Sequence, residues 1–507
     1  MSITAIGKLV LASLLVLVVL VGCTKTGSKA TDPSVAPSSG SSAAPSAAGE
    51  LPRVELNWYL MSYKQMEDTA LVEEAMNNIL LKKINATIKI NVIPFANYVE
   101  KMNVKIAAGD PFDIMLVNGA TYPTLAAKGA LVDLTNLIPK YAPDVQKVIT
   151  PSLFNATKIA GKIYAVPNLQ GLSMPTELAV RKDLFDKYHI PSSIKSFDEL
   201  DGAFDKILNE DKVTPLHVYY SGGGNTVYTY VMSAANFFRI GSPVIPGVYT
   251  PDMKVINQYE SDNFKNWVAW ARKAYQKGWI EKNAATATED FKSGKYASQF
   301  NAGGPQGREG QITAYGPSEF IDFGVKSTLT TAQIQATMNA VSSTSKNPER
   351  AMMLLNLINT DKELYNLMSF GIEGKHYVLK DGFRELPPGV TDDTNRYNMA
   401  VYFFIGNTYN RIPAKGENPN TSEAQRQFDA KAAEEPAMGL NYDATAMKTE
   451  IAQVTSVIEE YLPALATGSV DPDKYLPLML DKLKTAGVDK IIADKQKQLD
   501  AFLASRK

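Results

Sequence analysis

The sequence predicts an α/β protein whose first domain is built on a mostly parallel sheet. Segments 53–60, 86–93 and 112–117 have strand-forming patterns, because their apolar residues either alternate or run without interruption. Segments 66–83 and 97–109, which connect them, carry apolar residues at helical spacing. Strands that alternate with helices in this way pair in parallel, since each helix returns the chain to the start of the next strand.

Each of these elements has its own signal. The first strand and helix show regular apolar positions, at Val54, Leu56, Trp58 and Leu60 and then at Leu71, Ala75, Ile79 and Leu80. The second helix is expected to end at Gly109, because glycine is favoured just past a helix end. In parallel sheets, ligands bind beyond the carboxyl ends of the strands. We therefore expect the polar and aromatic segments 61–64, 94–97 and 118–122 to converge.

A second α/β region begins near Leu172. Segment 177–181 predicts a strand that leads into a helix, and 196–208 predicts a helix. Ser196 and Glu199 are spaced as a capping box, in which each side chain binds the other residue's backbone N–H.

Helices dominate the remainder of the chain. Trp267 and Trp270 lie at helical spacing, which is typical of core residues rather than of ligand contacts. A helix pair is expected over 347–368, and the end of the chain, 443–507, reads as largely helical. Gly468 and Gly487 are the expected helix stops there.

The charge balance excludes several classes of function. A formal net charge of -1 and the lack of a Lys/Arg-rich run argue against a nucleic-acid partner. The histidines His189, His217 and His376 lie far apart, and Cys23 is the single cysteine, so neither a zinc site nor a disulfide is predicted. We expect no cofactor, no metal and a monomeric protein.

The N-terminus predicts export and a lipid anchor. Lys8 precedes an apolar run over 9–21 that is too short to span a membrane and suits the core of a signal peptide. The sequence at 20–23, Leu-Val-Gly-Cys, resembles the lipobox of bacterial lipoproteins. That resemblance implies a signal peptide over 1–22 and a diacylglycerol-modified, palmitoylated Cys23 on the extracytoplasmic face of the cell membrane.

The segment after the cysteine predicts a tether. Residues 24–50 are rich in Ser, Ala, Pro and Gly, and Val35 is their one large aliphatic residue. Such a composition buries too little apolar area to offset the entropy of ordering. We therefore interpret 23–50 as a disordered tether that holds the folded part near the membrane.

Several segments together resemble the extracellular solute-binding proteins of carbohydrate-type ABC importers, in the branch with a distinctive helical C-terminal region. The resemblance rests on Cys23 with its tether, 107–119 (AAGDPFDIMLVNG), 161–167 (GKIYAVP), 291–300 (FKSGKYASQF), 343–364 and 370–379 (FGIEGKHYVL). It implies a two-lobed periplasmic-binding-protein-like fold (type II), in which each lobe is a mostly parallel sheet flanked by helices. Lobe one is expected to comprise 51–172 and 340–400, and lobe two 173–339 and 401–507.

The resemblance also implies a sugar between the lobes. Some relatives carry a calcium loop after the helix that corresponds to 196–208. Here that place reads NEDKVTP, which lacks the repeated carboxylates of such a site, so no calcium is predicted.

A sugar site needs amides or carboxylates for paired hydrogen bonds and aromatic rings for stacking. Glu373 is the carboxylate most expected to accept hydroxyl hydrogens, with a structural turn as the alternative. Residues 401–411 (VYFFIGNTYNR) alternate as a strand does. The predicted ligand-binding residues are Tyr63, Asn118, Tyr122, Asn168, Gln170, Tyr219, Tyr220, Asn225, Asn301, Gly303, Glu373, Phe404 and Asn407.

The predicted function is capture of a sugar, in the form of an oligosaccharide, by lobe closure and its delivery to a membrane permease, without catalysis. The main alternative is a lipid-anchored surface glycoside hydrolase, because pairs of carboxylates can be found in any chain of this size. A third is an anchored chaperone. The lack of complete nucleophile motifs argues against an enzyme. Residues 171–175 lack the second glycine of G-x-S-x-G. The S-x-x-K matches at Ser192 and Ser343 have no accompanying K-T-G motif in the folded part.

Overall fold

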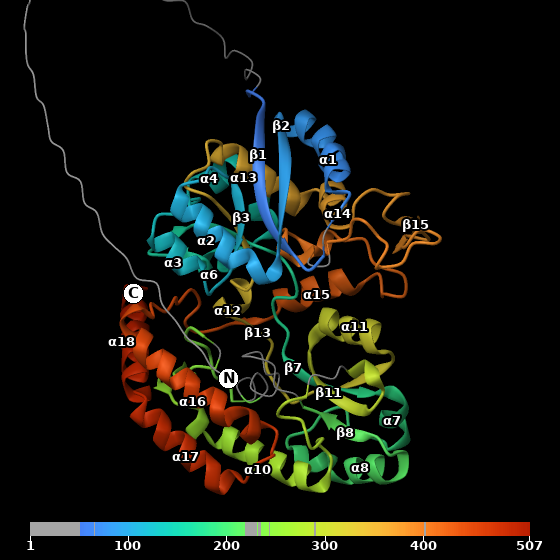
Figure 1. The fold of residues 1–507 in the computed structure, drawn as a ribbon, viewed down its shortest axis with the longest axis vertical. Helices are drawn as coiled ribbons and strands as arrows, with labels where there is room; N and C mark the ends of the chain where they lie inside the picture. Colours follow the sequence, from blue (N-terminus) through green and yellow to red (C-terminus); the bar gives the residue numbers. More distant parts are fainter. Residues whose placement is uncertain are drawn as a thin grey trace, which may run out of the picture. The chain divides into compact units, whose positions relative to one another are not determined.

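The computed structural model describes residues 51–506 except 65, 219–230, 232–234, 243, 288–290 and 400–401. Cys23 and the predicted signal peptide and tether therefore lie outside the described residues, as do Tyr219, Tyr220 and Asn225. Residues 51–507 form one compact unit, with the first sheet in its upper part and the second sheet in its lower part (Figure 1).

The first sheet has the strand order β2-β1-β3-β14-β6. Its strands are β1 (Val54–Ser62), β2 (Ala86–Pro94), β3 (Ile114–Val117), β14 (Met338–Val341) and β6 (Ala165–Pro167). The predicted parallel pairing is confirmed for β1 with β2 and β3, whereas β14 runs antiparallel to both β3 and β6. All residues of β3 are buried, which explains its uninterrupted apolar sequence.

The two predicted crossover helices are also confirmed. They are α1 (Thr69–Ile84) and α2 (Tyr98–Ala108). The second ends as expected, because Gly109 takes a left-handed conformation with φ of 70° that other residues rarely adopt. The first sheet and its helices bury one large core, which includes Trp58 and Met76 at 0% exposure.

The second sheet has the order β12-β7-β11-β8. Its strands are β7 (Thr176–Arg181), β8 (Thr214–His217), β11 (Tyr296–Ala302) and β12 (Ser318–Ile321). The predicted strand at 177–181 is confirmed as β7, but β7 pairs antiparallel with both β11 and β12. β8 pairs in parallel with β11. The capping box of Ser196 and Glu199 is present, at the start of a helical segment made of η2 (Phe197–Leu200), α8 (Asp201–Lys206) and η3 (Ile207–Asp211).

Helices from distant parts of the chain complete the second core. α10 (Asp262–Lys277) carries Trp267 and Trp270, which are 3% and 7% exposed, so their prediction as core residues is confirmed. The predicted helical end is confirmed as α16 (Lys448–Ala466), α17 (Pro472–Thr485) and α18 (Val488–Ser505). α16 and α17 pack on α10, and α18 packs on α16 and α17, in the lower part of the molecule (Figure 1).

The remaining elements cover the two sheets or connect them. The predicted helix pair is confirmed as α13 (Pro348–Thr360) and α14 (Lys362–Phe370). The remaining helices and strands include α3 (Tyr122–Ala127), α4 (Leu137–Tyr141), α5 (Val145–Val148), α6 (Pro151–Ala156), β4 (Lys158–Ile159), β5 (Lys162–Ile163), α7 (Lys182–Lys187), β9 (Val248–Tyr249), β10 (Val255–Ile256), α11 (Gly304–Tyr315), β13 (Thr328–Leu329), α12 (Thr331–Ile334), β15 (Val378–Lys380), β16 (Phe383–Glu385), α15 (Thr421–Ala430) and β17 (Ala433–Glu434).

The expected strand over 401–411 is wrong. Two short 3-10 turns, η6 (Tyr402–Phe404) and η7 (Thr408–Asn410), stand there on either side of Gly406, whose φ of 127° interrupts an extended chain. Phe404 and Ile405 pack in the core of the first sheet. The chain is therefore still with the first sheet at residue 405, beyond the expected boundary at 400.

Among the described residues, no helix is long and apolar enough to cross a membrane.

Candidate functional site

The carboxyl ends of β1, β2 and β3 carry the residues that were expected to converge. Figure 1 shows the ends of β1 and β2 directed toward α15 and the second sheet. Tyr63, just after β1, stacks on Phe95, just after β2, with ring centroids 4.9 Å apart and an interplanar angle of 21°. Met61 and Asn118 line one small pocket at the same edge. The predicted convergence of these segments is thus confirmed.

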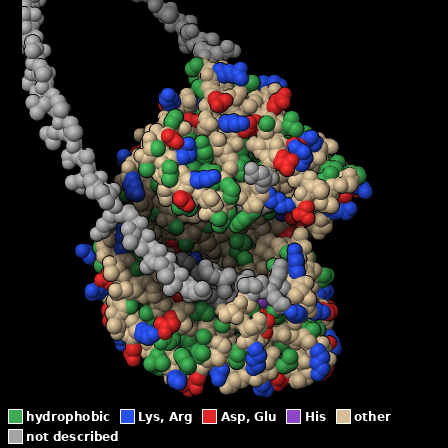
Figure 2. All heavy atoms as spheres, viewed as in Figure 1, with side chains coloured by type: hydrophobic (Ala, Val, Ile, Leu, Met, Phe, Trp, Pro, Cys, Tyr) green, Lys and Arg blue, Asp and Glu red, His purple; other side chains and the backbone are tan. Residues whose placement is uncertain are grey.

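This aromatic pair is exposed. Tyr63 and Phe95 are 64% and 47% exposed, although large rings are normally buried. Figure 2 shows that this face of residues 51–507 is hollowed between the upper and lower parts of the molecule. An exposed pair of stacked rings at the carboxyl ends of β1 and β2 provides an apolar surface on which a flat, partly apolar ligand can lie. We call Tyr63 and Phe95 the aromatic platform.

Asn118 has a local task at the end of β3. Its side-chain oxygen accepts hydrogen bonds from the backbone N–H groups of Ala120 and Thr121, at 3.1 and 3.2 Å. Because these bonds hold the turn into α3, the oxygen of Asn118 is already occupied. The amide nitrogen is therefore the atom of this side chain that remains available to bind a ligand.

Three predicted amides lie where the chain passes between the sheets. Asn168 is 1% exposed, and its oxygen accepts a hydrogen bond from Asn339 at 2.8 Å. Gln170 donates to the hydroxyl of Thr337 at 3.1 Å and is half-buried. Asn407, which is buried, donates to a backbone carbonyl of α13 and accepts from the N–H of residue 409. These amides connect the passing segments to one another, and Gln170 alone of the three is accessible from solvent.

Two predicted ligand contacts are enclosed by the first core. The Tyr122 side chain is 0% exposed, and its hydroxyl donates to the carbonyl of Thr157 and accepts from the N–H of Tyr164. Phe404 is 7% exposed and packs edge-on against Phe403. Both rings therefore pack in the core of the first sheet.

Two predicted ligand-binding residues, Asn301 and Gly303, lie at and just after the end of β11. The N–H of Gly303 donates to the carbonyl of Pro175 at 2.6 Å. A Cβ atom on Gly303 would lie 2.5 Å from that carbonyl oxygen, so no larger residue fits there. The side chain of Asn301 donates to the neighbouring carbonyl of Ala302. Gly303 therefore has a structural reason for its presence that needs no ligand.

Arg308 is a polar residue of this region that sequence reasoning missed. Its guanidinium donates two hydrogen bonds to the carboxylate of Glu177, at 2.8 and 2.6 Å. Glu177 is buried and the Arg308 side chain is 45% exposed. The pair is bidentate, which fixes the guanidinium in one orientation. The glycine-rich stretch 303–310 was the available signal, since it brings a helix close behind the strand.

Glu373 does not join the aromatic platform. It is exposed in a surface pocket of about 770 Å³ between α1, α14 and the loop after η7, together with Lys82 and Arg411. The turn that carries Glu373 is closed by a hydrogen bond from the N–H of Gly374 to the carbonyl of Tyr377. The turn accounts for the backbone at Glu373, and ligand binding by its side chain stays a prediction.

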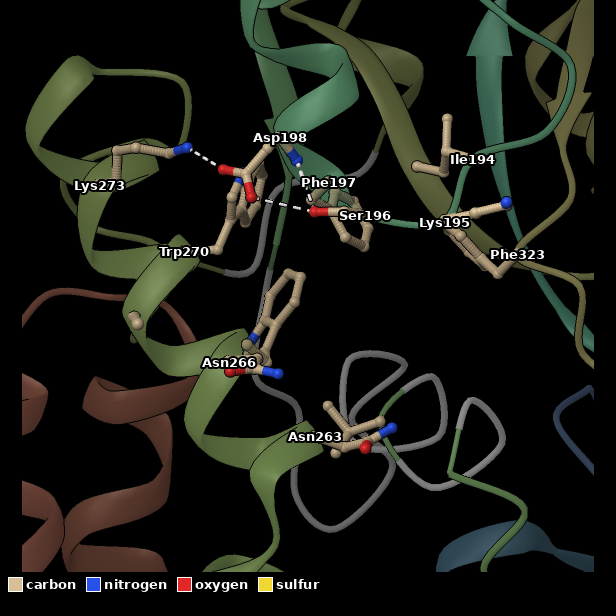
Figure 3. A pocket seen from close by; sticks show the side chains of 13 residues that line it. Ile194, Lys195, Ser196, Phe197, Asp198, Asn263, Asn266, Trp270, Lys273 and Phe323 are labelled. Atoms are coloured by element: carbon tan, nitrogen blue, oxygen red, sulfur yellow. Dashed lines mark hydrogen bonds and ion pairs between the residues drawn. The ribbon is translucent and has the colours of Figure 1, made fainter.

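A second pocket lies in the lower part of the molecule. It has a volume of about 760 Å³, and Figure 3 shows Phe197, Trp270 and Phe323 beside Asn263 and Asn266. The indole N–H of Trp270 reaches Asp201 at 3.4 Å, and Lys273 forms ion pairs with Asp198 and Asp201 at its rim. None of the predicted ligand-binding residues in the described part of the chain lines this pocket.

The described residues include several titratable groups whose pKa is shifted by their surroundings. No group of three or more His, Cys, Asp or Glu residues is arranged to hold a metal ion among the residues that the structure describes. On the face shown in Figure 2, cationic and anionic side chains are interspersed. The strongest local network surrounds Asp68. Burial by itself raises the pKa of Asp68, but hydrogen bonds from His376, Arg396 and Lys375 outweigh it and lower the pKa to about 2.

The chain is similar to known transport proteins over most of its length. It is 28% identical to a carbohydrate ABC transporter substrate-binding protein of Streptococcus pneumoniae over 441 residues, which are 85% of this chain and 87% of that protein. It is 28% identical over 210 residues, 37% of this chain and 38% of the relative, to the fructooligosaccharide ABC transporter substrate-binding protein of the same organism.

Solved structures give the same result. The N-glycan transport solute binding protein of Streptococcus pneumoniae superposes with a TM-score of 0.78 and 26% identity, over 90% of this chain and 100% of that one. A solute-binding protein of Bifidobacterium longum infantis superposes with a TM-score of 0.65 at 16% identity, over 88% of this chain and 99% of that one, and thus shares the fold. The predicted two-lobed, type II fold is therefore confirmed, with the first and second sheets as the centres of lobe one and lobe two.

Two family models match the chain. A domain of unknown function matches residues 436–504, which contain α16, α17 and α18. The model of the bacterial extracellular solute-binding proteins matches residues 65–363, which is more than half of the chain and includes strands of both sheets. The chain therefore belongs to the family of bacterial extracellular solute-binding proteins.

Proposed function

We propose that the protein captures an oligosaccharide between its two lobes and presents it to the permease of an ABC importer. The observation that carries this proposal is the aromatic platform, because exposed stacked rings at the carboxyl edge of the first sheet suit the apolar faces of sugar rings. Amides and the fixed Arg308 guanidinium lie on the neighbouring segments, where they can bind hydroxyl groups. A ligand that contacts both lobes favours the closed arrangement by its differential affinity.

The relatives support a glycan as the ligand. The N-glycan transport protein has been crystallised in complex with Man1GlcNAc and with Man5GlcNAc, at 25% and 26% identity to this chain. A mannose-containing oligosaccharide is therefore the first ligand to test. The protein binds and releases this ligand without breaking a bond, as the substrate-binding proteins to which it is similar are binding subunits.

The N-terminal sequence supports attachment to the membrane. The lipobox-like residues 20–23 place Cys23 where a diacylglycerol group would be attached, and two acyl chains suffice for lasting membrane anchoring. The Ser/Pro-rich residues 24–50 then let the binding lobes remain close to the permease.

A thermal-shift screen tests the proposed function. Residues 51–507 hold every described core in one compact unit, so a soluble form that comprises residues 24–507 retains the folded part. The screen compares mannose-containing oligosaccharides, fructooligosaccharides and monosaccharides. We expect the melting temperature to rise with oligosaccharides and no reducing ends to appear. Release of new reducing ends would establish the glycoside hydrolase instead.

A further inference from the structure

Three segments join the two lobes. The first crossing, 168–175, lies between β6 and β7; the second crossing, 322–337, lies between β12 and β14; the third crossing, 411–447, leads from η7 to α16. The second and third crossings form a two-stranded parallel sheet, β13 with β17. The hydroxyl groups of Ser173 and Ser327 join the first crossing to the second.

A buried carboxylate of the third crossing accepts hydrogen bonds from the backbone of the first crossing. Asp429 lies at the end of α15 and is 8% exposed. Its two oxygens accept hydrogen bonds from the consecutive backbone N–H groups of Leu172 and Ser173, at 3.1 and 2.8 Å. Residues 171–175 belong to no helix or strand, so the carboxylate supplies acceptors that a sheet would otherwise provide. The Tyr409 hydroxyl, from lobe one, lies 2.5 Å from Asp429.

Another buried carboxylate of the third crossing accepts a hydrogen bond from the backbone of the second crossing. Glu435 directly follows β17 and is 4% exposed. One oxygen accepts from the backbone N–H of Thr331, at the start of α12, at 2.5 Å, and the other accepts from the hydroxyl of Tyr249 in lobe two at 3.1 Å. The backbone N–H of Glu435 donates to the carbonyl of Leu329 at 2.9 Å.

The energetics favour a role in geometry over one in bulk stability. No salt bridge of either carboxylate is found among the described residues, and burial raises the pKa of both side chains, although the charge of Arg239 partly offsets this rise at Glu435. Removing an ionised carboxylate from water costs several kcal/mol, and apolar packing of the same volume would often be at least as stable. Hydrogen bonds from directed N–H groups, in contrast, hold a backbone at one place and orientation.

We propose that Asp429 and Glu435 are positioning residues for lobe closure, which clamp the first and second crossings to the third so that all three bend as one hinge. This inference rests on the proposed function, because closure matters only if the lobes enclose a ligand. Without the clamps the crossings bend independently and the lobes sample more arrangements. A smaller fraction of molecules then has the arrangement that binds, and the apparent affinity falls by that fraction.

The test measures lobe separation and binding in the same protein. The soluble form has no cysteine, since Cys23 is the only one in the sequence, so cysteines can be placed at the exposed residues Lys128 in lobe one and Lys206 in lobe two for fluorescence energy transfer. The variants are Asp429→Asn and Glu435→Gln, each of which presents an N–H₂ group to a former donor. The matched control is Glu423→Gln on α15, where the carboxylate pairs with Arg426 at the surface.

We expect both variants to broaden the ligand-free distribution of lobe separations and to weaken oligosaccharide binding about ten-fold, which is about 1.4 kcal/mol, while Glu423→Gln leaves both unchanged. All measurements are made well below the melting temperature of each variant. A lower melting temperature with unchanged lobe distribution and affinity would overturn the proposal, since that is the result of a merely structural role.

Two further measurements test the proposal if Asp429→Asn does not fold or if the wild-type protein binds no glycan. If Asp429→Asn does not fold, Tyr409→Phe removes the hydroxyl that lies 2.5 Å from both this carboxylate and the carbonyl of Gln170 in the first crossing, and it leaves the charge of Asp429 in place. It is expected to broaden the distribution less than Asp429→Asn would. If the wild-type protein binds no glycan, the proposed function fails, and the ligand-free lobe distribution still decides whether the two carboxylates set the hinge.

Discussion

Removal of the Tyr63 ring is the sharpest perturbation of the proposed binding surface. Tyr63 is 64% exposed and its ring lies flat against Phe95, so one face remains for a ligand. A tyrosine offers roughly 200 Å² of surface, of which about 130 Å² is exposed here. A sugar ring that covers half of it removes about 65 Å² from water, which at about 25 cal/mol per Å² contributes about 1.6 kcal/mol.

Tyr63→Ala should therefore weaken oligosaccharide binding about fifteen-fold. Titration calorimetry measures the dissociation constant, and Val104→Ala is the matched control, because Val104 is also 64% exposed in lobe one but lies on α2 away from the platform. The buried third of the ring makes some loss of stability inevitable, so binding is compared well below the melting temperature. An unchanged dissociation constant in Tyr63→Ala would refute the reasoning that the platform carries the ligand.

Three further predictions concern other parts of the chain. Glu373→Ala should leave the oligosaccharide dissociation constant within about two-fold, because Glu373 lies in the pocket between α1 and α14; a ten-fold loss by calorimetry would move the ligand to that pocket. Asp68 has a folded pKa of about 2, below its ordinary value of 3.8, so its contribution to stability is present above pH 4 and is lost as the pH falls toward 2. Asp68→Asn should therefore flatten the acid dependence of the melting temperature, and an unaltered slope would contradict this. Cys23→Ala should move the protein from the membrane fraction to the soluble fraction with no change in sugar affinity, whereas continued sedimentation with membranes would argue against the lipid anchor.

Local patterns were sufficient for the elements that alternate along the chain. Alternation in β1, the glycine stop after α2 and the capping box at Ser196 all depend on neighbours within a few residues, and each is present. The pairing of β14 with β3 could not be predicted, because the partners lie more than 200 residues apart in the sequence. The segment 401–411 was misread, since its alternating aromatic residues fill a core from two short turns.

The candidate site likewise contains residues that local sequence patterns predict and residues that they miss. Tyr63 is a predicted ligand contact because it follows a strand at the edge where ligands bind, and Phe95 lies in a segment predicted from the same rule. Tyr122 also follows a strand of this sheet, five residues after the end of β3, yet its side chain is buried in the core. Arg308 escaped notice because its partner, Glu177, is distant in sequence. The carboxylates of the crossings are those of Asp429 and Glu435. They likewise bind backbone N–H groups that are distant in sequence, so local patterns do not predict their role.

The central claim is that this chain binds a glycan and returns it intact. Titration of Man5GlcNAc into the soluble form, followed by mass spectrometry of the recovered glycan, tests that claim most directly. We expect one glycan to bind per chain, at the aromatic platform that contains Tyr63, and the glycan to be recovered with unchanged mass. Cleaved products would contradict it, as would a failure to bind any member of a panel of mannose- and fructose-containing oligosaccharides.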